Sequence, residues 1–89
     1  MKSYKLELTH QAGHALEKMA RREPAIYRRM ANALDALKED PFQGKALKGK
    51  LRGKYSFRVG SYRIIYTVHN QILTVFVIDI GHRREIYRQ

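Results

Sequence analysis

The chain has no cysteine among its 89 residues, which excludes disulfide bonds, thiolate metal sites and cysteine nucleophiles. It also has no long apolar stretch: the longest, within "ILTVFVIDI", is far shorter than the ~20 residues of a membrane-spanning helix. The opening "MKSYKLELTH" alternates polar and apolar residues and lacks the apolar segment of a signal peptide. We therefore expect a cytoplasmic protein with no membrane association and a single domain over residues 1–89, because this length closes one core.

Acidic side chains are scarce and unevenly distributed. The chain has 18 lysines and arginines against 8 aspartates and glutamates, which gives a formal net charge of +10. Residues 1–40 hold 8 basic and 6 acidic side chains, whereas residues 41–89 hold 10 basic and only 2 acidic ones. A field of one sign attracts a polyanion such as nucleic acid, or a strongly acidic protein partner. The alternative is a generic cationic surface that serves solubility.

Hydrophobic periodicity in the first half predicts a strand followed by two helices. Residues 4–9 alternate as a half-buried strand does, and residues 10–22 place apolar side chains at helical spacing. Thr9 can cap this helix, Pro24 suits the first turn of a second helix, and Pro41 ends that second helix. The connection between the helices is short, which predicts an antiparallel helical hairpin.

The second half predicts a basic loop and then three strands. Residues 42–54 mix glycine and lysine with two leucines, and strand-like runs follow at residues 55–59, 62–68 and 73–80. The "GS" connection fits a type II′ hairpin turn, and the third run is apolar on both faces, as in a covered central strand. We expect an α+β fold in which an N-terminal strand and a helical hairpin precede a three-stranded antiparallel β-meander and a short C-terminal tail.

The "GS" turn predicts an arginine pair. A two-residue loop places Val59 opposite Tyr62 and therefore Arg58 opposite Arg63, with Ser56 on the same face. Two arginines in this position repel each other unless an anion bridges them, and arginine suits phosphate because it donates two parallel hydrogen bonds. The nearby loop adds further cations, namely Lys48, Lys50, Arg52 and Lys54. The alternative is a solvated pair with water and salt between the two side chains.

The final residues, "GHRREIYRQ", place one phenol among several cations. An antiparallel third strand returns to Tyr62 and Arg63, so the tail leaves the sheet beside the arginine pair. Close cations favour a phenolate and lower the pKa of a tyrosine such as Tyr87, which can then accept a proton. The alternative for Tyr87 is a hydrophobic anchor for the tail. His82 adjoins the arginines and is a candidate for acid–base chemistry, or else a polar tail residue.

Metal and nucleotide sites are poorly supported. His10 and His14 have the spacing of two zinc ligands on a helix, but "HQAGH" lacks the glutamate and a clear third ligand. "GKLRGKY" is one residue too short for a P-loop and lacks the final serine or threonine. We expect no metal and no cofactor.

Two segments, "LRGKYSFRVGSYRIIYTV" and "VFVIDIGHRREIYR", resemble the RelE branch of the RelE/ParE toxin superfamily. The resemblance spans nearly the whole chain. It implies a metal-independent endoribonuclease toxin that cuts mRNA in the ribosomal A site. It also implies an acidic cognate antitoxin, with the ribosome and mRNA as further partners and operator DNA as a partner of the toxin–antitoxin complex.

By position, the resemblance implies catalytic roles for Arg58, Arg63, Arg83 and Tyr87. His82, or a lysine of the preceding loop, can compensate for a lysine that this chain lacks. The remaining cations and one serine are expected to contact RNA or the ribosome: Lys48, Lys50, Arg52, Lys54, Ser56, Arg84 and Arg88. Some family members carry a lysine where this chain has Ser56, which leaves the general base open. The rival functions are inhibition of DNA gyrase, as in the ParE branch on the same scaffold, and RNA binding without catalysis.

Overall fold

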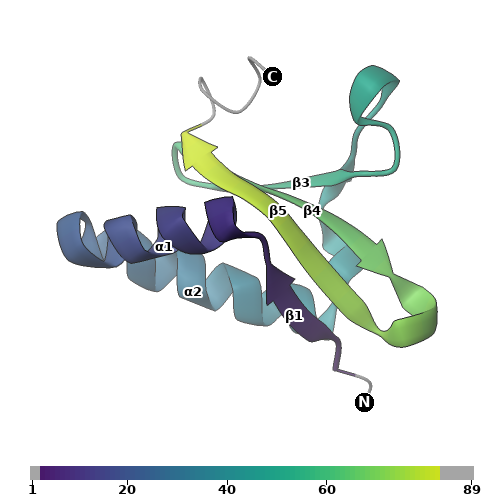
Figure 1. The fold of residues 1–89 in the computed structure, drawn as a ribbon, viewed down its shortest axis with the longest axis horizontal. Coiled ribbons are helices and arrows are strands. Elements are labelled where there is room, and N and C mark those ends of the chain that lie inside the picture. Colours follow the sequence, from purple (N-terminus) through teal and green to yellow (C-terminus); the bar gives the residue numbers. More distant parts are fainter. Residues whose placement is uncertain (1–2, 83–89) are drawn as a thin grey trace.

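Two helices cover one face of a five-stranded sheet in the computed structural model, which describes residues 3–82 (Figure 1). The elements are β1 (Lys5–Leu8), α1 (His10–Arg22), α2 (Pro24–Glu39), β2 (Lys45–Ala46), β3 (Tyr55–Val59), β4 (Tyr62–His69) and β5 (Thr74–His82). Strand, helical hairpin and antiparallel β-meander follow one another as predicted, which confirms the α+β fold. Neither helix within residues 3–82 is long and apolar enough to cross a membrane.

The sheet has the order β1-β5-β4-β3-β2 and differs from the prediction in two ways. First, β1 pairs with β5 in parallel while the other neighbours are antiparallel, so the sheet is mixed. Second, the predicted basic loop contains the short edge strand β2. Alternation in β1 marks a half-buried strand but does not specify its partner. Both residues of β2 are exposed, so no apolar pattern in the sequence indicates this strand.

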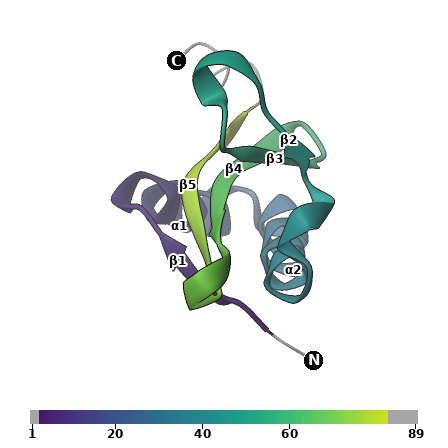
Figure 2. The same ribbon diagram turned by 90° about the vertical axis from the view of Figure 1, so that its right-hand side faces the viewer.

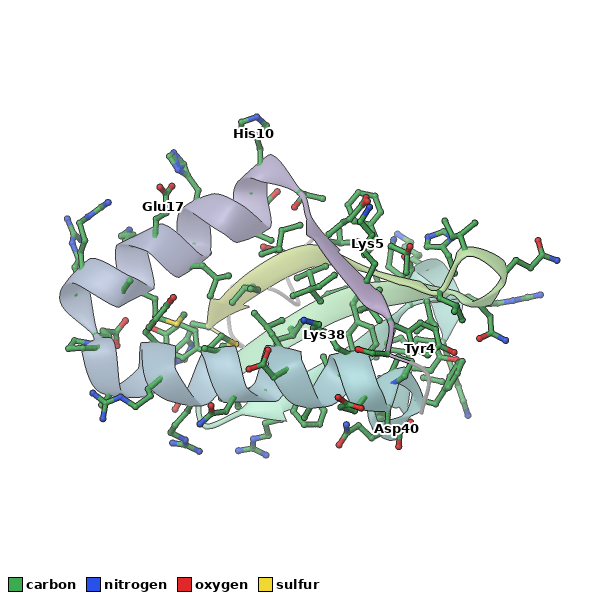
Figure 3. The ribbon with its side chains drawn as sticks, turned by 90° about the horizontal axis from the view of Figure 1, so that it is seen from below. Tyr4, Lys5, His10, Glu17, Lys38 and Asp40 are labelled. Carbon is green, nitrogen blue, oxygen red and sulfur yellow. The ribbon has the colours of Figure 1, made fainter. Side chains whose placement is uncertain are left out.

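The two helices begin and end where the sequence predicts. The Thr9 hydroxyl accepts a hydrogen bond from the Ala12 N–H at 3.1 Å and caps α1. Glu23 alone separates α1 from α2, and Pro24 is the first residue of α2. Asp40, which precedes a proline, has an extended backbone (φ −142°) and ends α2. Seen from below, both helices lie across the same face of the sheet, with Asp40 where α2 ends (Figure 3).

The core lies between the helices and the sheet. Its fully buried side chains include Met30 and Leu37 of α2, Ile64 of β4, and Val75 and Val77 of β5. On the opposite face of β5, Thr74 and Asp79 are buried, whereas Phe76 is 37% exposed.

Tyr66 joins the end of α2 to the sheet. Its ring is fully buried and stacked on Tyr55, with centroids 5.5 Å apart, and its hydroxyl donates to the Pro41 carbonyl oxygen at 2.8 Å. Gly44 passes so close that a Cβ atom there would overlap the Tyr66 hydroxyl. This packing fixes the chain between α2 and β2, and with it the start of the basic loop.

Tyr66→Phe should lower the free energy of unfolding by about 1–2 kcal/mol at neutral pH, because the buried Pro41 carbonyl loses its donor. Burial raises the pKa of Tyr66 to about 12, so the folded state favours the neutral phenol. Its contribution is complete below the unfolded pKa of 10 and is lost as pH rises to about 12.

Chemical denaturation between neutral pH and pH ~12 measures this effect. The parent should lose more stability than Tyr66→Phe over the alkaline range. The same alkaline loss in the parent and in Tyr66→Phe would exclude Tyr66 as its source.

Candidate functional site

The arginine pair lies where the turn predicted it. Val59 pairs with Tyr62 and Arg58 with Arg63 across the β3–β4 hairpin. Gly60 has a φ of +60° and Ser61 does not have a positive φ, which fits the predicted type II′ turn. The register follows from the two-residue loop, so both arginines share one face of the sheet.

That face is the one turned away from the helices. Arg63 is directly opposite Arg58 on β3 and Gly81 on β5, and these three residues form one row across the sheet. The next row consists of Ser56, Ile65 and Asp79. Residues between the two rows, such as Ile64 and Ile80, are buried in the helix-facing core. We call the two rows together the arginine face.

The two guanidinium groups lean in opposite directions along β3. Arg63 donates from Nη1 to the Ser56 hydroxyl at 3.1 Å, whereas Arg58 donates from Nε to the Gly60 carbonyl at 3.2 Å. This separation lowers their repulsion, so the register by itself does not require a bridging anion. Ser56 is only 3% exposed, which places its hydroxyl as a support for Arg63 and not as a surface contact for RNA.

The basic loop stands beside the arginine face. Its part after β2, residues 47–54, is closed by a hydrogen bond from the Leu47 N–H to the Lys54 carbonyl at 2.9 Å. Its exposed cations are Lys48, Lys50 and Arg52, and Lys54 is half-buried. In Figures 1 and 2 the loop rises from the sheet on the side away from the helices. The predicted loop cations and the arginine pair therefore border the same side of the molecule.

His82 lies on the other side of the sheet from Arg58 and Arg63. It pairs with Tyr62, and their rings meet edge to face with centroids 5.8 Å apart. The Tyr62 hydroxyl donates to a Glu23 carboxylate oxygen at 2.6 Å. His82 and Tyr62 line a pocket of about 320 Å³ together with α1 residues that include Lys18 and Arg22. Gly81 is opposite Arg63, and His82 follows Gly81 on β5. Adjacent residues on a strand point to opposite faces, so His82 and Arg63 lie on opposite sides of the sheet.

Asp79 is a site residue that the sequence analysis missed. It is 8% exposed and shares the arginine face with Arg63, so this face contains a carboxylate. The signal was present in the sequence: Asp79 lies two residues before Gly81, which the antiparallel register places opposite Arg63.

The other sequence-based candidates add little to this site. His14 lies 3.9 Å from a Glu17 carboxylate oxygen, and His10 points away from the molecule (Figure 3). Within residues 3–82, no three histidine, aspartate or glutamate side chains come close enough to share a metal ion. Four predicted site residues lie outside the described part of the chain, namely Arg83, Arg84, Tyr87 and Arg88.

Comparison with known proteins assigns this fold and sequence to a class of toxins. A family model described as "ParE toxin of type II toxin-antitoxin system, parDE" matches residues 6–87. Over 58 residues the chain is 36% identical to Toxin RelG of Mycobacterium tuberculosis, and this match covers 64% of this chain and 67% of the relative.

Two solved structures have closely similar folds. One is the toxin–antitoxin complex RelBE2 from Mycobacterium tuberculosis, with a TM-score of 0.81, 29% identity and coverage of 93% of this chain and 94% of that one. The other is the archaeal RelE–RelB complex from Pyrococcus horikoshii OT3, with a TM-score of 0.73, 27% identity and coverage of 91% and 96%.

Proposed function

The chain belongs to the RelE/ParE superfamily of toxins from type II toxin–antitoxin systems, and from this premise we propose that it is a metal-independent endoribonuclease that cuts mRNA in the ribosomal A site. The observation that carries the proposal is the arginine face, where Arg58 and Arg63 stand in register beside an exposed basic loop. We place this activity in the cytoplasm, where mRNA is translated.

Cleavage without a metal uses the 2′-hydroxyl of the RNA as the nucleophile. The protein must align this hydroxyl, remove its proton, stabilise the added negative charge on phosphorus and protonate the leaving 5′-oxygen. We assign charge stabilisation to Arg63 and Arg83, assisted by Arg58, since guanidinium groups bind phosphate oxygens in pairs. We assign proton removal to Tyr87, because His82 lies across the sheet from Arg63.

The remaining cations would hold the substrate. Exposed lysines and arginines attract the phosphate backbone of mRNA and ribosomal RNA regardless of sequence. We assign this role to Lys48, Lys50, Arg52, Lys54, Arg84 and Arg88, and protonation of the leaving oxygen to a lysine of the basic loop. Ser56 acts through Arg63 in this scheme, because it is buried.

We also propose a cognate acidic antitoxin as partner, with the toxin–antitoxin complex binding operator DNA. Both structural relatives described above are complexes of a toxin with its antitoxin. The positive charge of residues 41–89 would attract an acidic protein over a long range.

The rate of association with the antitoxin should therefore fall steeply as ionic strength rises, because salt screens attraction between opposite charges. Stopped-flow measurements at several salt concentrations give this dependence, and the dissociation rate serves as the internal comparison. Association that is indifferent to salt would contradict electrostatic capture.

Induction of the chain alone in bacterial cells tests the proposed function. Growth should stop, and new mRNA 5′ ends should appear within translated reading frames. Arg63→Ala should leave growth and mRNA intact at the same level of protein. Growth arrest by the parent without new 5′ ends would contradict the nuclease proposal.

Inhibition of DNA gyrase is the second candidate function, and the description of the matching family model as a ParE toxin favours it. In that case the same induction experiment would give gyrase-linked DNA breaks without cuts in mRNA. The arginine face would then bind its target without chemistry.

A further inference from the structure

Arg63 lies on β4, and the strand on each side of β4 carries a polar residue in the next row of the arginine face. Ser56 on β3 and Asp79 on β5 both pair with Ile65, one position from Arg63 on the same face. Gly81 is directly opposite Arg63 and has no side chain. Within residues 3–82, Asp79 is therefore the nearest side chain to Arg63 on β5 on this face, at a diagonal spacing that a long side chain can span.

The direction of the Arg63 side chain agrees with this arrangement. Its guanidinium group turns toward the row that contains Ser56 and donates to the Ser56 hydroxyl at 3.1 Å. It turns away from Arg58, whose Nε donates a hydrogen bond in the opposite direction, to the Gly60 carbonyl oxygen. Asp79 lies in the same row as Ser56 but on β5, across β4 from Ser56, so its attraction acts through its charge. A nearby buried carboxylate attracts a guanidinium group and offsets the repulsion between the paired arginines.

We propose that Ser56 and Asp79 are positioning residues that orient Arg63 toward its anion, the hydroxyl through a hydrogen bond and the carboxylate through its charge. Ser56 and Asp79 are 3% and 8% exposed, so they act from beneath the surface. The inference about cleavage rests on the proposed function, whereas the orientation of Arg63 can be measured without it.

The first measurement is the side-chain Nε–H signal of Arg63 in the NMR spectrum of the parent, assigned by its absence in Arg63→Lys. Ser56→Ala should accelerate hydrogen exchange of this signal because the guanidinium group loses its hydrogen-bond acceptor. Asp79→Asn should do the same because it removes the charge that attracts the guanidinium group. Ser61→Ala and Asp35→Asn remove an exposed hydroxyl and an exposed carboxylate elsewhere and should leave it unchanged. Thermal unfolding of each variant separates loss of orientation from loss of fold.

The second measurement is cleavage of ribosome-bound mRNA. Ser56→Ala and Asp79→Asn should lower kcat by roughly 10- to 100-fold, as misplacement of a reacting group does, while KM stays near the parental value. In an Arg63→Ala background the same two changes should have no further effect, because both act through Arg63. Ser56→Thr keeps the hydroxyl and should retain the parental Arg63 signal. If Asp79→Asn does not fold, Asp79→Glu, which keeps the charge, should retain it too.

An unchanged Arg63 signal in both Ser56→Ala and Asp79→Asn would overturn the inference, and so would an equal loss of kcat with and without Arg63. A parent that cuts no mRNA would refute the proposed function instead. The Arg63 signal would still decide whether Ser56 and Asp79 position this side chain.

Discussion

Arg63→Ala should reduce the rate of mRNA cleavage on the ribosome by roughly 10²- to 10³-fold, the loss typical of removing one donor to a transition state. The guanidinium group is half-buried on the arginine face and held by Ser56, so it is oriented before the substrate arrives. The contribution of Arg63 should grow as negative charge develops on phosphorus. Its loss should therefore lower kcat more than it raises KM. Arg83→Ala should have an effect of the same order.

The matched control is Arg28→Ala, which removes an exposed arginine from α2 and should leave cleavage unchanged. Arg63→Lys keeps the charge but cannot donate two parallel hydrogen bonds, so it should recover only part of the loss. Single-turnover cleavage and thermal unfolding are measured for each variant. Parental cleavage by a folded Arg63→Ala protein would remove Arg63 from the catalytic group.

Tyr87→Phe should produce a second large loss of cleavage with unchanged thermal stability. The substitution keeps the ring and removes only the hydroxyl, which we propose accepts the proton of the RNA 2′-hydroxyl. The cations around Tyr87 in "GHRREIYRQ" would favour the phenolate form.

Tyr27→Phe, at an exposed tyrosine of α2, is the matched control and should cut mRNA as the parent does. If Tyr87→Phe also cuts like the parent while Tyr87→Ala unfolds, the tyrosine serves as an anchor for the tail. Proton removal would then need another group, and His82 would be tested next in spite of its position across the sheet.

The arginine pair could be predicted from the sequence because it depends on local geometry. A two-residue turn that starts with glycine fixes the pairing of β3 with β4, and period-two alternation then assigns Ser56, Arg58 and Arg63 to one face. Helix boundaries were equally local, since Thr9 and Pro41 act on the backbone beside them.

Features that depend on distant partners were not predictable in the same way. The parallel pairing of β1 with β5 and the edge strand β2 arise from tertiary contacts that no local pattern encodes. His82 was a candidate because it adjoins the arginines in the chain, and the structure places it on the face of the sheet opposite to Arg63, since neighbouring strand residues face opposite ways. The same rule places Asp79, two residues before Gly81, on the arginine face.

Cleavage by the purified chain, with free mRNA compared to mRNA on translating ribosomes, tests the central claim most directly. The proposal predicts metal-independent cuts in the A-site codon, unaffected by a chelator of free divalent ions added after ribosome binding, with free mRNA left nearly intact. Arg63→Ala in the same reaction should abolish most of the cleavage. Equal cutting of free and ribosome-bound mRNA would remove the ribosome from the mechanism, and no cutting of either would contradict the nuclease proposal.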